Sequence, residues 1–176
     1  MPTKKLFVLV GLPFSGKTTW AREFVADSVT IISRDEILEQ INKDVVLRAR
    51  LFIEVQSIIQ PESKIFFEKE KNAWNDVVTK EYVRQVIQKV QKSESEVVIV
   101  DGTHLSSASR KFVEMDFGRT KIAVQISTSK DLCIERWRQA IVTGIRSTIT
   151  EELIQTMDRL REDPSKSEGF DEILLV

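Results

Sequence analysis

The sequence predicts an α/β fold in which a parallel sheet is covered by helices on both faces. Two observations support this: apolar runs without polar breaks recur along the 176 residues, and segments of helical periodicity separate them. Such uninterrupted runs are typical of strands buried on both faces. The expected strands are 6–10, 29–32, 97–100, 122–126 and 173–176.

Helical patterns fill most of the intervals between these strands. Residues 33–36, Ser-Arg-Asp-Glu, have the form of a capping box and predict a helix start. Further helices are expected directly after residue 16 and over 79–87, 107–117, 129–141 and 150–161. Because strands and helices alternate, we expect a parallel sheet with helical crossovers.

The segment 45–76 departs from this alternation, because it separates two strands by more than one crossover helix. Apolar residues recur near helical spacing over 51–59, Pro61 interrupts them, and aromatic residues follow at 66, 67 and 74. Two interpretations are open: an amphipathic helix pair packed on the core, or an aromatic platform that grips a substrate. Either way we expect a helical insertion within a single domain spanning 1–176.

Composition limits the classes of partner. Lys and Arg number 26 against 27 Asp and Glu, and the pI is about 6.0, so no basic field favours nucleic acid. The single cysteine, Cys133, cannot form an internal disulfide and is expected in the core. The first apolar run has only the length of a strand, so we expect no signal peptide, no membrane span and a reducing cytoplasm.

Residues 11–18, Gly-Leu-Pro-Phe-Ser-Gly-Lys-Thr, fit the pattern G-x-x-x-x-G-K-[ST] and follow the first expected strand. Such a loop turns backbone N–H groups toward phosphate oxygens at the positive end of the next helix. Lys17 is expected to reach the β- and γ-phosphates of ATP, and Thr18 to hold Mg²⁺. The alternative, a glycine turn that binds nothing, does not account for the flanking strand and helix. The expected nucleotide-binding residues are Gly11, Pro13, Phe14, Ser15, Gly16, Lys17, Thr18, Thr19 and, from a later helix, Arg136.

Two aspartates follow expected strands. Asp35 has the position of a general base that accepts the proton of an attacking hydroxyl; the alternative is that it only stabilises a helix N-terminus. Asp101 ends the run 97–100, a pattern in which the carboxylate holds Mg²⁺ directly or through water. We expect Thr18 and Asp101 at the metal, with Asp35 in its outer shell.

The turn after Asp101 contains Thr103 and His104, which we expect to face the same crevice and its substrate. For His104, the only histidine, an ordinary loop histidine bonded to the backbone is the alternative. The segment 136–149 has the character of a lid, in which Arg138 and Arg146 would stabilise charge on the transferring phosphoryl group. Arg136 directly follows Glu135, and the alternative for it is an ion pair with acidic residues on its own helix. The alternative for the whole arginine cluster is a solvent-exposed basic surface without a catalytic role.

Taken together, these motifs resemble the P-loop kinases of the polynucleotide-kinase and zeta-toxin-like group, of AAA_33 type. The segments that carry the resemblance are 11–18, 33–35, 101–104, 133–136, 157–164 and 168–171. The resemblance implies an adenylate-kinase-like fold with sheet order 2-3-1-4-5, a base at Asp35, and lid arginines that clamp the phosphates.

Two positions differ from the 5′-hydroxyl kinases of that group. Leu38 stands where an arginine usually holds the substrate phosphate, and His104 stands where asparagine is common. Arg34 or Arg110 would then supply the guanidinium. The residues expected to contact substrate are Arg34, Asp101, Thr103, His104 and Arg110.

The sequence therefore predicts an ATP- and Mg²⁺-dependent kinase acting on a hydroxyl, as the 5′-hydroxyl polynucleotide kinases do. The first alternative acceptor is a small metabolite or nucleotide sugar, which the neutral charge and Leu38 favour. The alternative from another class is an ATP-binding switch or assembly factor that docks a partner on the aromatic insertion.

Overall fold

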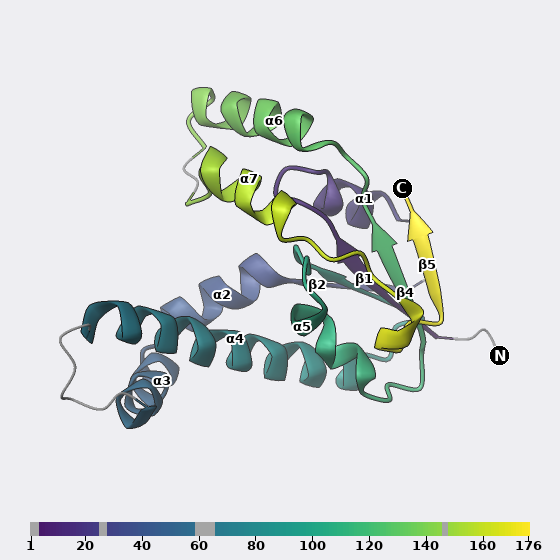
Figure 1. The fold of residues 1–176 in the computed structure, drawn as a ribbon. Helices are drawn as coiled ribbons and strands as arrows, with labels where there is room; N and C mark the ends of the chain where they lie inside the picture. Colours follow the sequence, from purple (N-terminus) through teal and green to yellow (C-terminus); the bar gives the residue numbers. More distant parts are fainter. Residues whose placement is uncertain (1–3, 25–27, 59–65, 146–147) are drawn as a thin grey trace. The chain divides into compact units, whose positions relative to one another are not determined.

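The computed structural model describes residues 4–24, 28–58, 66–145 and 148–176, with backbone only at 66–71 (Figure 1). The chain forms two compact units. The first comprises Met1–Ile32 and Ser93–Val176, and the second comprises Ser33–Lys92. The phosphate loop, residues 11–18, lies in the first unit, and Asp35 lies in the second.

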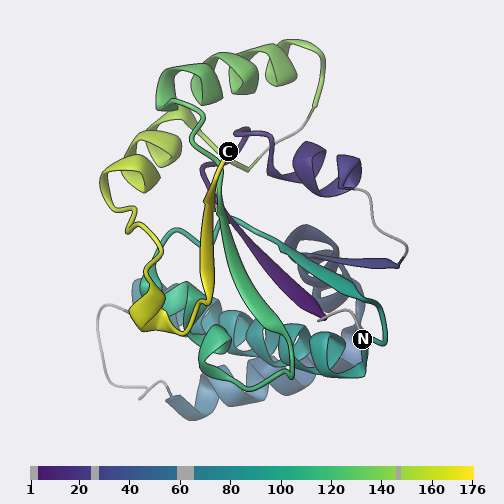
Figure 2. The same ribbon diagram turned by 90° about the vertical axis from the view of Figure 1, so that its right-hand side faces the viewer.

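A five-stranded sheet forms the centre of the first unit. Its strands are β1 (Lys5–Val10), β2 (Val29–Ser33), β3 (Val97–Asp101), β4 (Thr120–Gln125) and β5 (Glu172–Leu175). The order is β2-β3-β1-β4-β5, and β1 pairs in parallel with both β3 and β4, as β4 does with β5. In Figure 2 the edge strand β5 faces the viewer. The predicted sheet order 2-3-1-4-5 and all five expected strands are confirmed, with small shifts at their ends.

The helices of the first unit follow the expected intervals. They are α1 (Lys17–Glu23), α5 (Ser107–Arg110), α6 (Lys130–Val142) and α7 (Glu151–Arg159), with 3₁₀ turns at Lys111–Glu114 and Lys166–Glu168. Ser129 and Thr150 cap α6 and α7 by accepting backbone N–H groups, and these two helices lie side by side (Figure 1). The single helix expected over 107–117 is instead a short α-helix followed by a 3₁₀ turn.

Two apolar clusters stabilise the first unit. The larger joins β1, β3 and β4 to Ala21 of α1, with Trp20 and Phe24 packed against it. The smaller lies under α6 and α7 and contains Leu12 of the phosphate loop together with Cys133 and Ile154. Cys133 is therefore the core residue that the sequence predicts, and its burial raises the pKa of its thiol.

The second unit consists of α2 (Arg34–Lys43), α3 (Val45–Ile58) and α4 (Phe66–Lys92). The Ser33 hydroxyl accepts the Glu36 N–H, which confirms the predicted helix start. Both α2 and α3 pack on α4, and Leu51 and Val55 form the buried side of α3. Residues 45–58 and 66–76 are helical. The helix expected at 79–87 is the later part of α4, so no helix boundary falls at residue 76. Pro61, the expected break, lies outside the described residues.

A buried carboxylate joins α3 to α4. Glu81 is 5% exposed, and its oxygens accept hydrogen bonds from Arg84 (2.6 and 2.8 Å), Gln85 (2.8 Å) and Arg50 (3.2 Å). The hydrogen bond from Arg84 is the main reason that the pKa of Glu81 is lowered. This carboxylate is fully satisfied within the unit, so it serves the packing of the helices.

Among the helices within the described ranges, none combines the length and the apolar character that crossing a membrane requires.

Candidate nucleotide site

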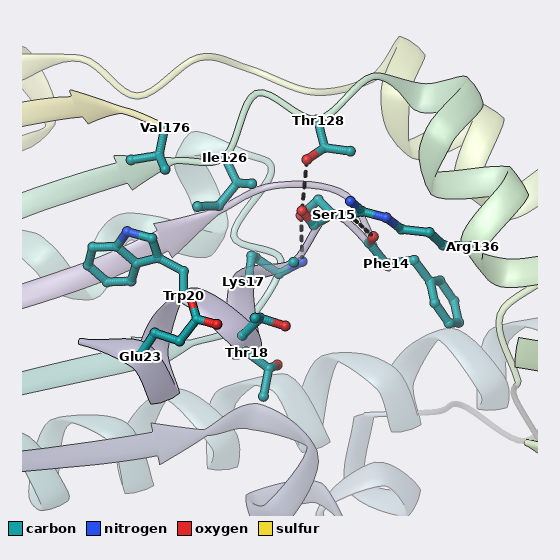
Figure 3. Close-up of a pocket in the computed structure, with 12 residues that line it drawn as sticks. Phe14, Ser15, Lys17, Thr18, Trp20, Glu23, Ile126, Thr128, Arg136 and Val176 are labelled. Atoms are coloured by element: carbon teal, nitrogen blue, oxygen red, sulfur yellow. Dashed lines mark hydrogen bonds between the residues drawn. The ribbon is translucent and has the colours of Figure 1, made fainter. Parts of the chain in front are cut away.

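The phosphate loop joins β1 to α1 through an unusual backbone. Gly16 is the N-cap of α1 and has φ 100°, a left-handed conformation that glycine adopts without steric cost. Phe14, two residues earlier, also has a positive φ of 63°. The Thr128 hydroxyl donates to the Ser15 carbonyl (2.8 Å), and Arg136 Nη1 donates to the Phe14 carbonyl (3.2 Å; Figure 3). Two side chains from outside the loop therefore fix its carbonyl groups.

Lys17 begins α1 and is 8% exposed. Its ammonium group donates to the Leu12 carbonyl (2.5 Å) and lies 3.4 Å from the Ser15 hydroxyl. A buried lysine at the positive end of a helix is electrostatically costly by itself, because it adds a cation to the helix dipole. An anion at this position would offset that cost.

The structure brings Thr18 and Asp101 together. The Thr18 hydroxyl donates to Asp101 Oδ2 at 2.7 Å, across 83 residues of sequence. The contact follows from the topology: β3 is paired beside β1, so the loops after both strands meet at the same edge. A hydroxyl oxygen beside a carboxylate that is only 8% exposed is a donor set suited to Mg²⁺. In the part of the chain that the structure describes, no three His, Cys, Asp or Glu side chains form a metal cluster of their own.

A pocket of about 640 Å³ opens beside the phosphate loop (Figure 3). Seven residues predicted to bind nucleotide line it, namely Phe14, Ser15, Gly16, Lys17, Thr18, Thr19 and Arg136. Gly11 and Pro13 are not among its lining residues. The Gly11 N–H donates to the Thr103 carbonyl (3.0 Å), so Gly11 fastens the start of the loop.

Sequence reasoning missed five lining residues: Trp20, Glu23, Ile126, Thr128 and Val176. Trp20 and Glu23 lie three positions apart on α1, so helical spacing from the motif was a signal that would have found them. The other three follow β4 and β5, and only the sheet order brings those strand ends beside the phosphate loop. These residues extend the pocket beyond the phosphate-binding part.

The two arginines of α6 have different partners in the structure. Arg138, expected to stabilise the transferring group, makes a bidentate pair with Glu151 of α7 (Nη2 to Oε2, 2.8 Å). Arg136, expected to pair within its helix as one alternative, reaches the phosphate loop instead. The reason is helical geometry: two residues apart on a helix is a turn of about 200°, so the two side chains leave on opposite sides. Arg146 lies outside the described residues.

Two of the expected substrate contacts have buried side chains that bond within the protein. Arg110 is 0% exposed and donates to the Glu168 carboxylate (2.7 and 2.8 Å) and to the carbonyls of His104 and Glu162 (2.8 and 3.0 Å). His104 is 2% exposed, and its Nδ1 lies 2.9 Å from the Leu9 carbonyl. The alternative of a histidine bonded to the backbone is therefore correct. Thr103 is half-buried and contributes its carbonyl to the phosphate loop.

The remaining candidates belong to the second unit. Asp35 is exposed in the first turn of α2, and the guanidinium of Arg34 lies 5.7 Å from the centre of the Tyr82 ring. The role of Asp35 as a base and that of Arg34 as a substrate contact stay predictions.

The sheet order and the phosphate loop together define a P-loop nucleotide-binding protein. More particularly, the chain belongs to the AAA_33 family (AAA domain), whose model matches residues 6–164. No curated protein matches the chain by sequence.

Solved structures of similar fold include two named kinases. One is a gluconokinase from Sinorhizobium meliloti, with TM-score 0.56 and 18% identity, matched over 100% of this chain and 83% of that one. Another is a shikimate kinase from Acinetobacter baumannii in complex with shikimate, with TM-score 0.56 and 18% identity, matched over 98% of this chain and 84% of that one. At these identities the likeness shows a common fold.

Proposed function

We propose that the protein is an ATP- and Mg²⁺-dependent kinase that transfers the γ-phosphoryl group to a hydroxyl. The observation that carries this proposal is the 2.7 Å contact between Thr18 and Asp101 beside a buried Lys17. A loop that cradles phosphates, a lysine and a pair of oxygen ligands are the parts that phosphoryl transfer requires.

Each residue of the site has a role in this mechanism. The loop N–H groups and Lys17 bind the β- and γ-phosphates and offset the charge that moves onto the leaving oxygen. Thr18 and Asp101 are the residues that would hold Mg²⁺, which supplies charge stabilisation at the phosphates when it is bound. Arg136 contributes a further positive charge at the phosphate loop.

Asp35 completes the mechanism as the general base. It lies two residues after the end of β2, and in parallel sheets ligands bind at the carboxyl ends of the strands. An exposed carboxylate there is accessible to a hydroxyl acceptor and accepts its proton as the phosphoryl group arrives. This task distinguishes a kinase from a nucleotide switch, in which Asp35 would have no function.

We infer that the acceptor is a small molecule. An oligonucleotide acceptor needs a guanidinium for its phosphate. Leu38 does not supply one and Arg110 is buried against Glu168, so Arg34 is the one candidate left of these three. The near-neutral net charge also favours a small acceptor, because the chain has 26 basic and 27 acidic residues. The two similar structures named above are, by their names, kinases of small hydroxylated molecules.

The test is transfer of labelled γ-phosphate from ATP to a panel of acceptors, with wild type, Asp35→Asn and Lys17→Met compared. The panel holds sugar acids, hydroxy acids, nucleosides, and RNA and DNA oligonucleotides with 5′-hydroxyl ends. We expect transfer to at least one small acceptor. This transfer should depend on salt much less steeply than oligonucleotide binding does, and it should be lost in Asp35→Asn while ATP binding is retained.

Other outcomes identify the alternatives. Transfer to oligonucleotides that weakens steeply with salt would replace the small acceptor by a nucleic acid. Slow ATP hydrolysis that no acceptor stimulates and that Asp35→Asn leaves unchanged would contradict a kinase and favour a switch.

A further inference from the structure

The turn after β3 carries Asp101 and continues through His104 to α5. We propose that His104 is a positioning residue, whose imidazole holds this turn against the phosphate loop and thereby keeps Asp101 in register with Thr18. The inference rests on the proposed function, because it concerns how the Mg²⁺ ligands of that site are aligned.

The first observation is the hydrogen bond of the imidazole. His104 Nδ1 lies 2.9 Å from the Leu9 carbonyl, and the ring is 2% exposed. A carbonyl oxygen only accepts, so Nδ1 carries the proton and donates. Leu9 is a residue of β1, just before the phosphate loop begins. The imidazole therefore ties the loop after β3 to the strand that positions the phosphates.

A second hydrogen bond attaches the same turn to the phosphate loop. The Thr103 carbonyl accepts the N–H of Gly11, the first residue of the phosphate loop, at 3.0 Å. Asp101 and Thr18 meet beside these two attachments. Besides the Thr18–Asp101 contact, the turn is thus attached at two points: to β1 through the imidazole, and to the first residue of the phosphate loop through the Thr103 carbonyl.

Backbone strain shows that the position of the ring is enforced. His104 has φ 42°, a left-handed conformation that is unfavourable for a residue with a Cβ and persists only where its surroundings fix it. Arg110 Nη1 donates to the His104 carbonyl (2.8 Å), and the Phe112 ring meets the imidazole edge-on at 5.7 Å between centroids. A fully buried arginine and an aromatic ring therefore hold both ends of this residue.

Gly102 makes room for the ring. A Cβ built at Gly102 would lie 2.7 Å from His104 Cε1, a distance that real Cβ atoms essentially never show, and 3.1 Å from Nε2, which is a tight contact. Asp101 directly precedes Gly102, so a displacement of the ring would reach the Asp101 carboxylate through a single residue. Residues that orient a metal ligand typically change metal affinity by about 10- to 100-fold when they are mutated.

The experiment measures the Mg²⁺ concentration for half-maximal binding of a fluorescent ATP analogue by the whole chain. His104→Leu fills the space but cannot donate to Leu9, so we expect its Mg²⁺ midpoint to rise about tenfold while Mg²⁺-free nucleotide binding stays unchanged. In His104→Asn, we expect most of the wild-type midpoint to return, because asparagine tolerates a positive φ and carries an N–H donor.

Arg119→Met is the matched control. It removes a buried arginine whose bonds to Ser93, Ser95 and Glu96 lie outside the nucleotide site, so it loses stability without touching the turn. An equal rise of the Mg²⁺ midpoint in Arg119→Met would overturn the proposal in favour of general destabilisation. Should His104→Leu fail to fold, Gly102→Ala is the second variant, with the same expected shift in Mg²⁺ midpoint.

Two outcomes separate this inference from the proposed function. If wild type binds no nucleotide with Mg²⁺, the proposed function fails. If wild type binds and both His104→Leu and Gly102→Ala keep its Mg²⁺ midpoint, only the positioning role is wrong. Because His104 is the only histidine, its ¹⁵N resonances identify the protonated nitrogen without ambiguity, and protonation at Nε2 alone would also contradict the bond to Leu9.

Discussion

Two buried cations in the first unit, Lys17 and Arg119, are each 8% exposed but have different surroundings. Arg119 precedes β4 and donates to the carbonyls of Ser93 (2.6 Å) and Ser95 (2.8 Å), and its burial lowers its pKa. Lys17 follows the carboxyl end of β1, at the start of a helix and on the wall of a pocket of about 640 Å³. Burial of a charge therefore does not by itself indicate function. Both cations donate to backbone carbonyl groups, and the distinguishing feature of Lys17 is that it also lines a pocket beside the phosphate loop.

The largest expected effect comes from a substitution that tests the functional role of Lys17. Lys17→Met keeps the apolar stem of the side chain but removes the charge that meets the phosphates. We expect phosphoryl transfer to fall by about 100- to 1000-fold, as when a single charge-stabilising donor is removed. The thermal midpoint should not fall, because the change removes a buried charge. A variant with wild-type transfer would exclude Lys17 from the site.

Arg119→Met tests the structural role of the second buried cation. The change leaves the half-buried carbonyl groups of Ser93 and Ser95 without their arginine donor, so we expect the free energy of unfolding to drop by about 2 kcal/mol. Denaturant unfolding measures this loss, and transfer activity per folded molecule should match wild type at temperatures below the transition. A selective loss of activity with unchanged stability would contradict a purely structural role.

A smaller effect separates the two arginines of α6. We expect Arg136→Ala to weaken ATP binding by about tenfold, since its guanidinium lies at the phosphate loop (Nη1 to the Phe14 carbonyl, 3.2 Å). Arg138→Ala removes an exposed pair with Glu151, worth less than about 1 kcal/mol of stability. Calorimetric titration of both variants with ATP shows which substitution weakens ATP binding more. A larger loss of affinity in Arg138→Ala would contradict the assignment of Arg136 as the arginine at the phosphate loop.

The smallest effect appears only in acid. The hydrogen bond from Arg110 lowers the pKa of Glu168 from its usual value of 4.5. A lowered folded-state pKa contributes stability above the unfolded-state value, which is lost as the pH falls through the folded-state value. We therefore expect the unfolding free energy of wild type to fall more steeply below about pH 4.5 than that of Glu168→Gln. If the unfolding free energies of the two proteins depended on pH in the same way, Glu168 would not contribute to the loss of stability in acid.

The sequence was sufficient where the signal is local. The phosphate loop is eight consecutive residues, and each strand is one apolar run, so both were predicted within a residue or two. Residues 66–92 contain neither glycine nor proline, and nothing ends a helix there, which explains why α4 runs through the boundary expected at 76.

The sequence was insufficient where a partner lies far along the chain. Arg110 had the spacing of a substrate ligand, but its carboxylate partner is Glu168, 58 residues away, and only the fold brings the two together. Arg138 is held in the same way by Glu151 of the next helix. From the sequence, His104 could face a substrate or bond to the backbone. Its hydrogen bond to the Leu9 carbonyl of β1, which is distant in sequence, decided between the two.

The most direct test of the central claim is calorimetric titration of wild type and Lys17→Met with ATP, with and without Mg²⁺. The account predicts saturable binding to wild type that Mg²⁺ strengthens, and at least a hundredfold weaker binding to the variant. Equal binding by both proteins, or no binding by either, would contradict a Mg²⁺–nucleotide site at the phosphate loop.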